Sequence, residues 1–117
     1  MELFIDTTNR DFLLVALRES GRVVAQKKVA TKANQSEKLW PAVDALLKDN
    51  KIEPTGLKQI VAANGQGSFT ALRIGLAAAN ALGYAWGVPV KDETGKVERT
   101  KGLRIIAPRY TAEAKIG

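Results

Sequence analysis

The sequence feature that most constrains this chain is a glycine-rich step from an apolar run into a helical pattern. The run Ile-Val-Ala-Ala at residues 60–63 is typical of a buried strand, and Gly65 and Gly67 follow it closely. Glycine adopts backbone angles that other residues avoid, and it lets another group approach the main chain. Ser68 is a suitable N-cap for a helix. The sequence therefore predicts a strand, a tight turn and a helix over residues 60–86.

The predicted helix over residues 69–86 has two faces of different character. One face combines apolar and small residues at helical spacing: Leu72, Gly75, Leu76, Ala79, Leu82, Gly83 and Trp86. The other face is mixed and carries Phe69, Arg73, Ala77, Asn80 and Tyr84. We expect one face to pack on a sheet and the other to be available to a partner. Periodicity alone leaves open which face does which.

The residues before this step predict three strands and a first helix. Short apolar runs at residues 3–5, 12–17 and 22–29 are separated by polar turns, which favours an antiparallel meander. Residues 39–47 then place Leu39, Trp40, Val43, Leu46 and Leu47 on one helical face, with Pro41 expected near the start of the helix.

After residue 86 the pattern becomes weaker. Gly87 and Pro89 are typical of a helix stop, and residues 88–91 are expected to form a short strand. Residues 92–102 are charged and predict a solvated loop or loose hairpin, while residues 103–107 are apolar enough to return to the sheet. The whole order is β-β-β-α-β-α-β, which predicts an α/β fold with a mixed sheet and two main helices. This is the ribonuclease-H-like lobe of the actin/hexokinase-type (ASKHA) fold.

Length and composition exclude several classes of chemistry. A chain of 117 residues forms one domain, and without an apolar run of about 20 residues no membrane span is expected, so the cytoplasm is the default location. The sequence contains no cysteine and no histidine, which excludes disulfides, thiol nucleophiles and imidazole-based triads. A net charge of +6 suits an acidic partner such as RNA or an acidic protein surface.

Two motifs together carry a family resemblance. They are Phe4-Ile5-Asp6-Thr7 at the start and Gly65-Gln66-Gly67-Ser68-Phe69-Thr70-Ala71-Leu72-Arg73-Ile74-Gly75 in the middle. The chain resembles the TsaB family over residues 2 to about 90, and the tail around residues 108–110 is similar to the end of that family. TsaB is the non-catalytic dimerisation subunit of the machinery that makes threonylcarbamoyladenosine in tRNA.

The resemblance implies partners rather than chemistry. It implies binding to a TsaD-type catalytic subunit, a possible contact with a TsaE-type ATPase, and a homodimer when the chain is alone. It implies contact with tRNA only through the complex, no cofactor and no metal. The chain departs from the family because residues 92–102 stand where a second lobe is usual, and because Asn34-Gln35-Ser36 lacks the usual histidine. We therefore expect residues 1–117 to form a single TsaB-like lobe.

The helices of this lobe are the predicted partner interface. In the family they bundle with the corresponding helices of TsaD or of a second TsaB. Carried over to this sequence, the expected interface residues are Trp40, Val43, Leu47, Phe69, Leu72, Arg73, Gly75, Leu76, Ala79 and Gly83.

A second hypothesis concerns phosphate. Asp6 and Thr7 follow the first strand where ATPases of this superfamily place a phosphate-handling acid, and Gly65, Gly67 and Ser68 could cradle phosphate on backbone N–H groups. Under the alternative interpretation Asp6 caps a turn and the glycines serve packing.

The rival functions are a remnant nucleotide-binding protein and a small basic RNA-binding protein. A peptidase ranks lowest, because no nucleophile–base pair is visible. The basic residues, including Lys96, Arg99, Lys101, Arg104 and Arg109, look scattered.

Overall fold

The computed structural model describes residues 1–32, 34–64, 69–93, 98–100 and 103–105. Its elements, in chain order, are β1 (Glu2–Asp6), β2 (Phe12–Glu19), β3 (Arg22–Ala30), α1 (Gln35–Asp49), the 3-10 turn η1 (Pro54–Gly56), β4 (Gln59–Ala62), α2 (Phe69–Trp86), β5 (Val90–Asp92), β6 (Glu98–Thr100) and β7 (Leu103–Ile105). The strands and helices predicted up to residue 91 are confirmed, with ends that shift by a few residues.

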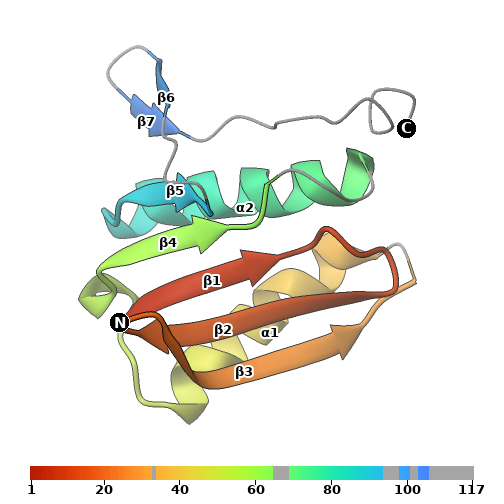
Figure 1. Cartoon of the computed structure of the whole chain (residues 1–117), viewed down its shortest axis with the longest axis horizontal. Coiled ribbons are helices and arrows are strands. Elements are labelled where there is room, and N and C mark those ends of the chain that lie inside the picture. The colour runs from red at the N-terminus through yellow and green to blue at the C-terminus, as the bar shows by residue number, and fades with distance from the viewer. Residues whose placement is uncertain (33, 65–68, 94–97, 101–102, 106–117) are drawn as a thin grey trace.

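Five of the strands form one mixed sheet in the order β3-β2-β1-β4-β5 (Figure 1). β1, β2 and β3 are antiparallel neighbours, and Ser20 and Gly21 connect β2 to β3 with φ angles of +53° and +79°. β4 runs parallel to β1, and β5 runs parallel to β4. Parallel neighbours need crossover connections, and α1 and α2 provide them. The predicted topology of a meander followed by two crossovers is therefore confirmed.

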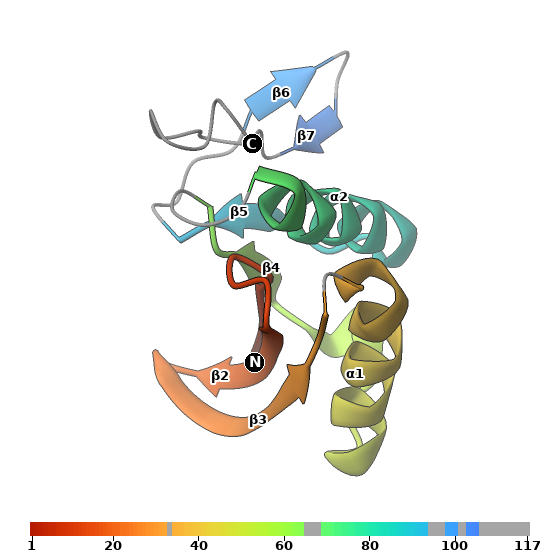
Figure 2. The same ribbon diagram turned by 90° about the vertical axis from the view of Figure 1, so that its right-hand side faces the viewer.

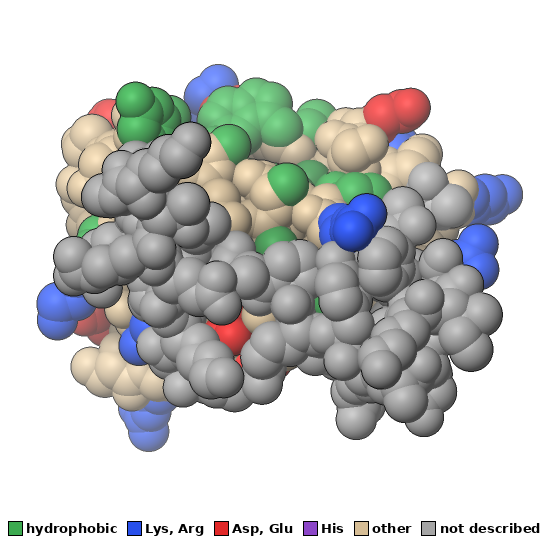
Figure 3. Space-filling model, turned by 90° about the horizontal axis from the view of Figure 1, so that it is seen from above, with side chains coloured by type: hydrophobic (Ala, Val, Ile, Leu, Met, Phe, Trp, Pro, Cys, Tyr) green, Lys and Arg blue, Asp and Glu red, His purple; other side chains and the backbone are tan. Residues whose placement is uncertain are grey.

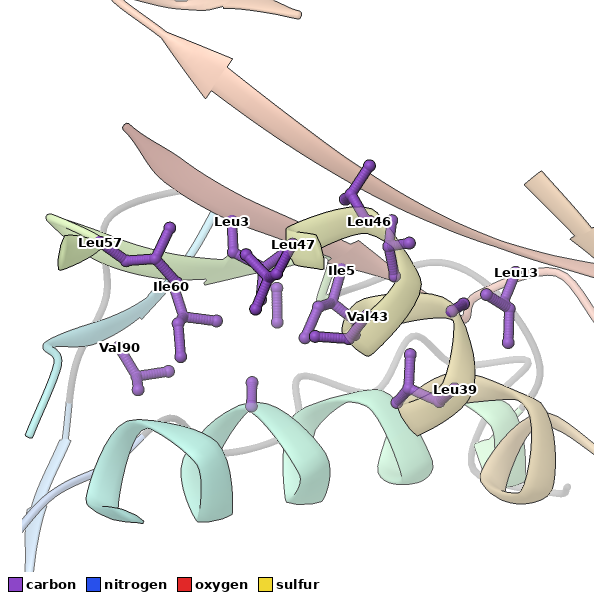
Figure 4. Packing of buried hydrophobic residues seen from close by; sticks show 14 of the residues in the cluster. Leu3, Ile5, Leu13, Leu39, Val43, Leu46, Leu47, Leu57, Ile60 and Val90 are labelled. Atoms are coloured by element: carbon purple, nitrogen blue, oxygen red, sulfur yellow. The ribbon is translucent and has the colours of Figure 1, made fainter. Parts of the chain in front are cut away.

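Both helices lie on the same face of this sheet (Figure 2). Alternate strand residues, including Leu3 and Ile5 on β1, point toward the helices because side chains alternate across a strand. Leu39, Val43, Leu46 and Leu47 of α1 meet the strand residues in one core (Figure 4). These side chains are at most 3% exposed, so each contributes about 1.5–3 kcal/mol through the burial of apolar surface.

Two glycines set how closely α2 approaches the sheet. A Cβ atom added to Gly75 would collide with Oγ1 of the buried Thr7, which directly follows β1. A Cβ atom added to Gly83 would collide with the side chain of Val90 and would lie 2.9 Å from the carbonyl oxygen of Val88. The absence of a side chain at these two positions therefore lets α2 lie against β1 and β5.

α1 begins earlier than the apolar pattern indicates. The buried side chain of Gln35 donates from Nε2 to the carbonyl oxygens of Asn9 (3.1 Å) and Arg10 (3.2 Å) in the β1–β2 turn. This anchor adds a polar first turn to the helix. Pro41 consequently lies in the second turn of α1, which corrects its expected place near the start.

The C-terminal strands differ from the prediction. Leu103–Ile105 was expected to return to the main sheet, but it pairs with β6 in a separate antiparallel two-stranded sheet. Asp92 was expected in a loop, yet it ends β5 and is 1% exposed. Its side chain accepts a hydrogen bond from Asn64 Nδ2 (3.1 Å), and this polar contact explains how a carboxylate can extend the strand into the interior.

Candidate functional site

The described surface has an apolar groove where α1 and α2 lie side by side. Its volume is about 340 Å³. α1 contributes Ser36, Leu39 and Trp40, and α2 contributes Ile74, Ala77, Ala78, Ala81 and Leu82. Hydrophobic side chains also gather on the helix side of the molecule in the space-filling view (Figure 3). Ser36 is the single polar residue of this lining, so the groove suits an apolar group.

The groove is hollow because its α2 wall is made mostly of alanine. Residues 74, 77, 78, 81 and 82 recur at spacings of three and four, and therefore share one side of the helix. A methyl group reaches only a short distance from the helix axis, so the alanines leave room beside the larger Leu39 and Trp40 of α1. The shape follows directly from residue size.

Trp40 is the large side chain that stands at the edge of this groove. Its ring is 6.2 Å from that of Trp86 at an interplanar angle of 48°, so the two helices are joined by a tilted aromatic pair. Trp40 is nevertheless 50% exposed, whereas its neighbour Leu39 is 3% exposed. A half-exposed tryptophan beside an apolar hollow has the character of a binding hot spot.

A second hollow of about 410 Å³ lies on the other side of Trp40. Its lining is amphipathic and includes Trp40, Asp44, Leu47, Lys48, Lys51, Ile52, Glu53 and Pro54. The ammonium group of Lys48 lies 3.0 Å from the carboxylate of Asp44, one helical turn away. Trp40 therefore separates an apolar groove from a charged one.

The structure corrects which residues of the two helices are accessible. Of the ten predicted interface residues, seven are buried in the core of the chain itself: Val43, Leu47, Leu72, Gly75, Leu76, Ala79 and Gly83. Their helix faces pack on the sheet, so they expose little surface to a partner in this conformation, although Leu47 also borders the second hollow. Their role in a partner interface stays a prediction. Trp40 and Arg73 are exposed, and the side chain of Phe69 lies outside the described part of the structure.

Sequence reasoning missed most of the groove lining. Ile74, Ala78 and Ala81 were assigned to neither face of α2, and Ser36 was placed in a polar stretch before the first helix. A signal was present in the run Ala77-Ala78-Ala79-Asn80-Ala81, which leaves the outer side of a helix almost without charge. A solvent-facing helix side is normally rich in charged residues, so this run marks an unusual surface.

The residues of the phosphate hypothesis make structural contacts. Asp6 Oδ1 accepts hydrogen bonds from the backbone N–H (2.9 Å) and the hydroxyl (2.6 Å) of Thr8, which is the turn-capping geometry expected under the alternative interpretation. Thr7 is 2% exposed and packs against Gly75. Gly65, Gly67 and Ser68 lie outside the described residues. Phosphate contact at these positions stays a prediction.

Polar residues also meet at the carboxyl ends of β4 and β5. Asn64 is 1% exposed, its backbone N–H donates to the carboxylate of Glu93, and its side chain donates to Asp92. These contacts fix the chain where it leaves β4 toward residues 65–68.

In the described part of the chain, no group of three or more acidic, histidine or cysteine side chains is arranged to hold a metal ion. None of its helices combines the length and the apolar character needed to cross a membrane.

The comparisons with known proteins agree with this architecture. The family model described as "TsaD: tRNA N6-adenosine threonylcarbamoyltransferase" matches residues 23–92. The tRNA threonylcarbamoyladenosine biosynthesis protein TsaB of Bacillus subtilis is 39% identical over 88 residues, which are 75% of this chain and 38% of that protein. An uncharacterised protein of Mycobacterium tuberculosis is 37% identical over 89 residues, 75% of this chain and 42% of its own length.

Solved structures show the same fold. YeaZ from Pseudomonas aeruginosa superimposes with a TM-score of 0.69 and 26% identity over 78% of this chain and 41% of YeaZ. A second structure, described as similar to peptidase YeaZ from the same organism, has a TM-score of 0.70 at 20% identity over 92% of this chain and 63% of that one, which supports the fold alone. The predicted ASKHA-type α/β fold is therefore confirmed. The chain spans about 40% of the length of the curated relatives it matches.

Proposed function

Because this chain belongs to the TsaB/YeaZ family, we propose that it is a non-catalytic subunit that binds a TsaD-type threonylcarbamoyl transferase. In this role it holds the catalytic subunit in an active arrangement during the modification of tRNA to N6-threonylcarbamoyladenosine. In this proposal it acts in the cytoplasm, needs no cofactor, and has a TsaE-type ATPase as a further partner. Binding stabilises one conformation of the partner, which is how a subunit without chemistry raises activity.

The observation that carries the proposal is the apolar groove between α1 and α2. Its lining residues Trp40 and Ala81 are exposed, and its volume of about 340 Å³ accommodates a large apolar side chain from another protein. Exposed apolar hollows flanked by a half-exposed tryptophan are typical of protein–protein contacts. We therefore propose that the groove residues contact the partner, in place of the residues of the same two helices that were predicted from the sequence and are buried.

The same groove supports a homodimer when the catalytic subunit is absent. A surface that binds a helix pair of a related protein can also bind its own copy across a two-fold axis, because the two subunits present the same patch to each other. The two modes would then be mutually exclusive, and adding the partner would convert homodimer to heterodimer.

Light scattering on a sizing column tests the proposal. The chain is run alone and mixed with the TsaD-type protein of the same organism. The variant Ala81→Glu puts a charge into the apolar groove and should remove the heteromeric peak. Ala85→Glu is the matched control, because Ala85 is exposed on the same helix but lines neither hollow.

The two variants are expected to differ in their affinity for the partner. We expect Ala81→Glu to weaken partner binding at least 10-fold and Ala85→Glu to leave it within about twofold, with both variants folded by circular dichroism. A wild-type chain that gives no heteromeric peak at micromolar concentrations would refute the subunit role. Equal effects of the two variants would place the interface elsewhere.

A further inference from the structure

The positive charge of this chain is concentrated near its C-terminal end. Residues 1–93 contain 12 Lys and Arg against 10 Asp and Glu, a net charge of +2. Residues 94–117 contain six against two, a net charge of +4 in 24 residues. The lobe that carries the groove is thus close to neutral, and the basic character of the protein belongs to the segment after β5.

Within that segment, β6 and β7 place two arginines opposite each other. The antiparallel register pairs Glu98 with Ile105, Arg99 with Arg104, and Thr100 with Leu103. Like charges at directly opposite positions destabilise a strand pair, and an isolated two-stranded hairpin is at best marginally stable. The sequence made these arginines look scattered, five positions apart, but the hairpin makes them neighbours.

The alternation of strand residues separates this pair from the rest of the hairpin. Positions 99 and 104 share one face of the two-stranded ladder, while Glu98, Thr100, Leu103 and Ile105 occupy the other. One face therefore carries only arginine, and the hairpin's single acid falls on the opposite face together with its two apolar residues. β7 lies next to β5, so the hairpin is attached to the edge of the sheet farthest from β3.

We infer that the β6–β7 hairpin binds the phosphate backbone of tRNA, with Arg99 and Arg104 as the phosphate ligands. An anion bound at these two register positions would offset the repulsion between their like charges. Guanidinium also matches phosphate geometry, because its planar fork donates two parallel hydrogen bonds. The inference rests on the proposed function, since tRNA is the polyanion that this function brings to the complex. It adds a direct contact to tRNA that the family resemblance does not imply.

Fluorescence anisotropy with a labelled, unmodified tRNA transcript tests the inference on the whole chain. The decisive variant is Arg99→Glu, because it replaces the repulsive pair by an opposite-charge pair and so should strengthen the hairpin. We expect it to weaken tRNA binding at least 10-fold at about 50 mM salt. The double variant Arg99→Ala/Arg104→Ala should reduce the slope of log K against log salt by about 1.4–1.8, as expected for two lost phosphate contacts.

A matched control removes the same amount of charge from elsewhere. Arg22 and Lys32 are exposed and lie in β3 and in the β3–α1 connection, outside the hairpin. The variant Arg22→Ala/Lys32→Ala should keep tRNA affinity within about twofold. An equal loss in this control, or unchanged affinity in Arg99→Glu, would overturn the inference. Competition by polyglutamate as strong as that by unlabelled tRNA would overturn it as well, since the site would then serve acidic proteins.

The sizing-column experiment distinguishes this inference from the proposed function. Arg99→Glu should still form the heteromeric peak with the TsaD-type protein, because the groove lining includes no residue of the hairpin. Loss of tRNA binding with an intact heteromeric peak is the expected result. A wild-type chain that forms the peak but does not bind tRNA refutes the hairpin inference alone, whereas absence of the peak refutes the proposed function alone.

Discussion

The two sides of α2 use small residues for opposite purposes. On the sheet side, Gly75, Ala79 and Gly83 are small because β1 and β5 approach the helix closely. On the outer side, Ala77 and Ala81 are small and nothing in the described chain fills the space beside them, so they leave a groove. Both sets recur at helical spacing. A stripe of small residues therefore indicates close packing only when something is packed against it.

The comparison predicts that substitutions on the two sides of α2 affect different properties. The largest effect is expected for Ala79→Leu, since Ala79 is fully buried and three further carbon atoms have no room. We expect a loss of about 3 kcal/mol in the free energy of unfolding, at the upper end of overpacking costs. Ala77→Leu, two residues away and exposed, should change it by less than about 0.5 kcal/mol. Urea denaturation followed at 222 nm measures both, and equal losses would contradict the distinction.

Trp40→Ala tests whether the groove beside the outer side of α2 contributes to partner binding. The exposed half of Trp40 borders both hollows, so its removal should weaken binding of the TsaD-type partner by about 2 kcal/mol, or about 30-fold. Titration calorimetry measures the change. Lys38→Ala, an exposed change on the same helix that borders neither hollow, serves as control and should leave affinity nearly unchanged. A Trp40→Ala variant with wild-type affinity would remove the groove from the interface.

Gly83→Ala tests the close approach of α2 to the sheet. The added Cβ collides with the Val90 side chain and comes within 2.9 Å of the Val88 carbonyl oxygen. The helix gains about 1 kcal/mol from replacing glycine by alanine, which offsets part of the steric cost. We expect a net loss of about 1 kcal/mol in the free energy of unfolding.

Gly56→Ala is the control for that glycine, because an added Cβ at Gly56 has open space around it. Its free energy of unfolding should stay within about 0.5 kcal/mol of the wild type. If Gly83→Ala proves as stable as Gly56→Ala, α2 does not need a glycine to reach β5.

The smallest expected change in stability concerns a surface ion pair away from α2, which serves as a reference for the effects predicted on that helix. The Met1 ammonium group lies 2.9 Å from the carboxylate of Glu19, and this hydrogen-bonded ion pair holds the pKa of Glu19 below its ordinary value. A lowered folded-state pKa stabilises the fold above the unfolded pKa, and the contribution is lost as the pH falls through the folded pKa. Glu19→Gln should therefore be slightly less stable than the wild type at pH 7. The difference should vanish in acid, as thermal melts at several pH values would show.

Much of the fold could be predicted from the sequence because its signals are local. The Ser20-Gly21 turn and the short apolar runs at residues 3–5, 12–17 and 22–29 each depend on a few neighbouring residues, and the corresponding elements are confirmed. The predicted glycine-rich turn at residues 65–68 lies outside the described residues. The family resemblance also came from a contiguous motif around residues 65–75. The pairing of the last strand was predicted wrongly: β7 pairs with β6 rather than with the main sheet, and this choice depends on competition between alternative partner strands.

The candidate site was only partly predictable for the same physical reason. The sequence by itself determined that α2 has two faces, that Trp40 is a large aromatic on α1, and that the chemistry of cysteine and histidine is absent. The tertiary structure decided which face of α2 is buried, because this depends on the sheet that the helix meets. It also decided that Trp40 is half exposed and that Arg99 stands opposite Arg104. Sequence periodicity shows which residues share one face of a helix or strand. Whether that face is buried, and which strand pairs with which, depends on the elements that pack against it.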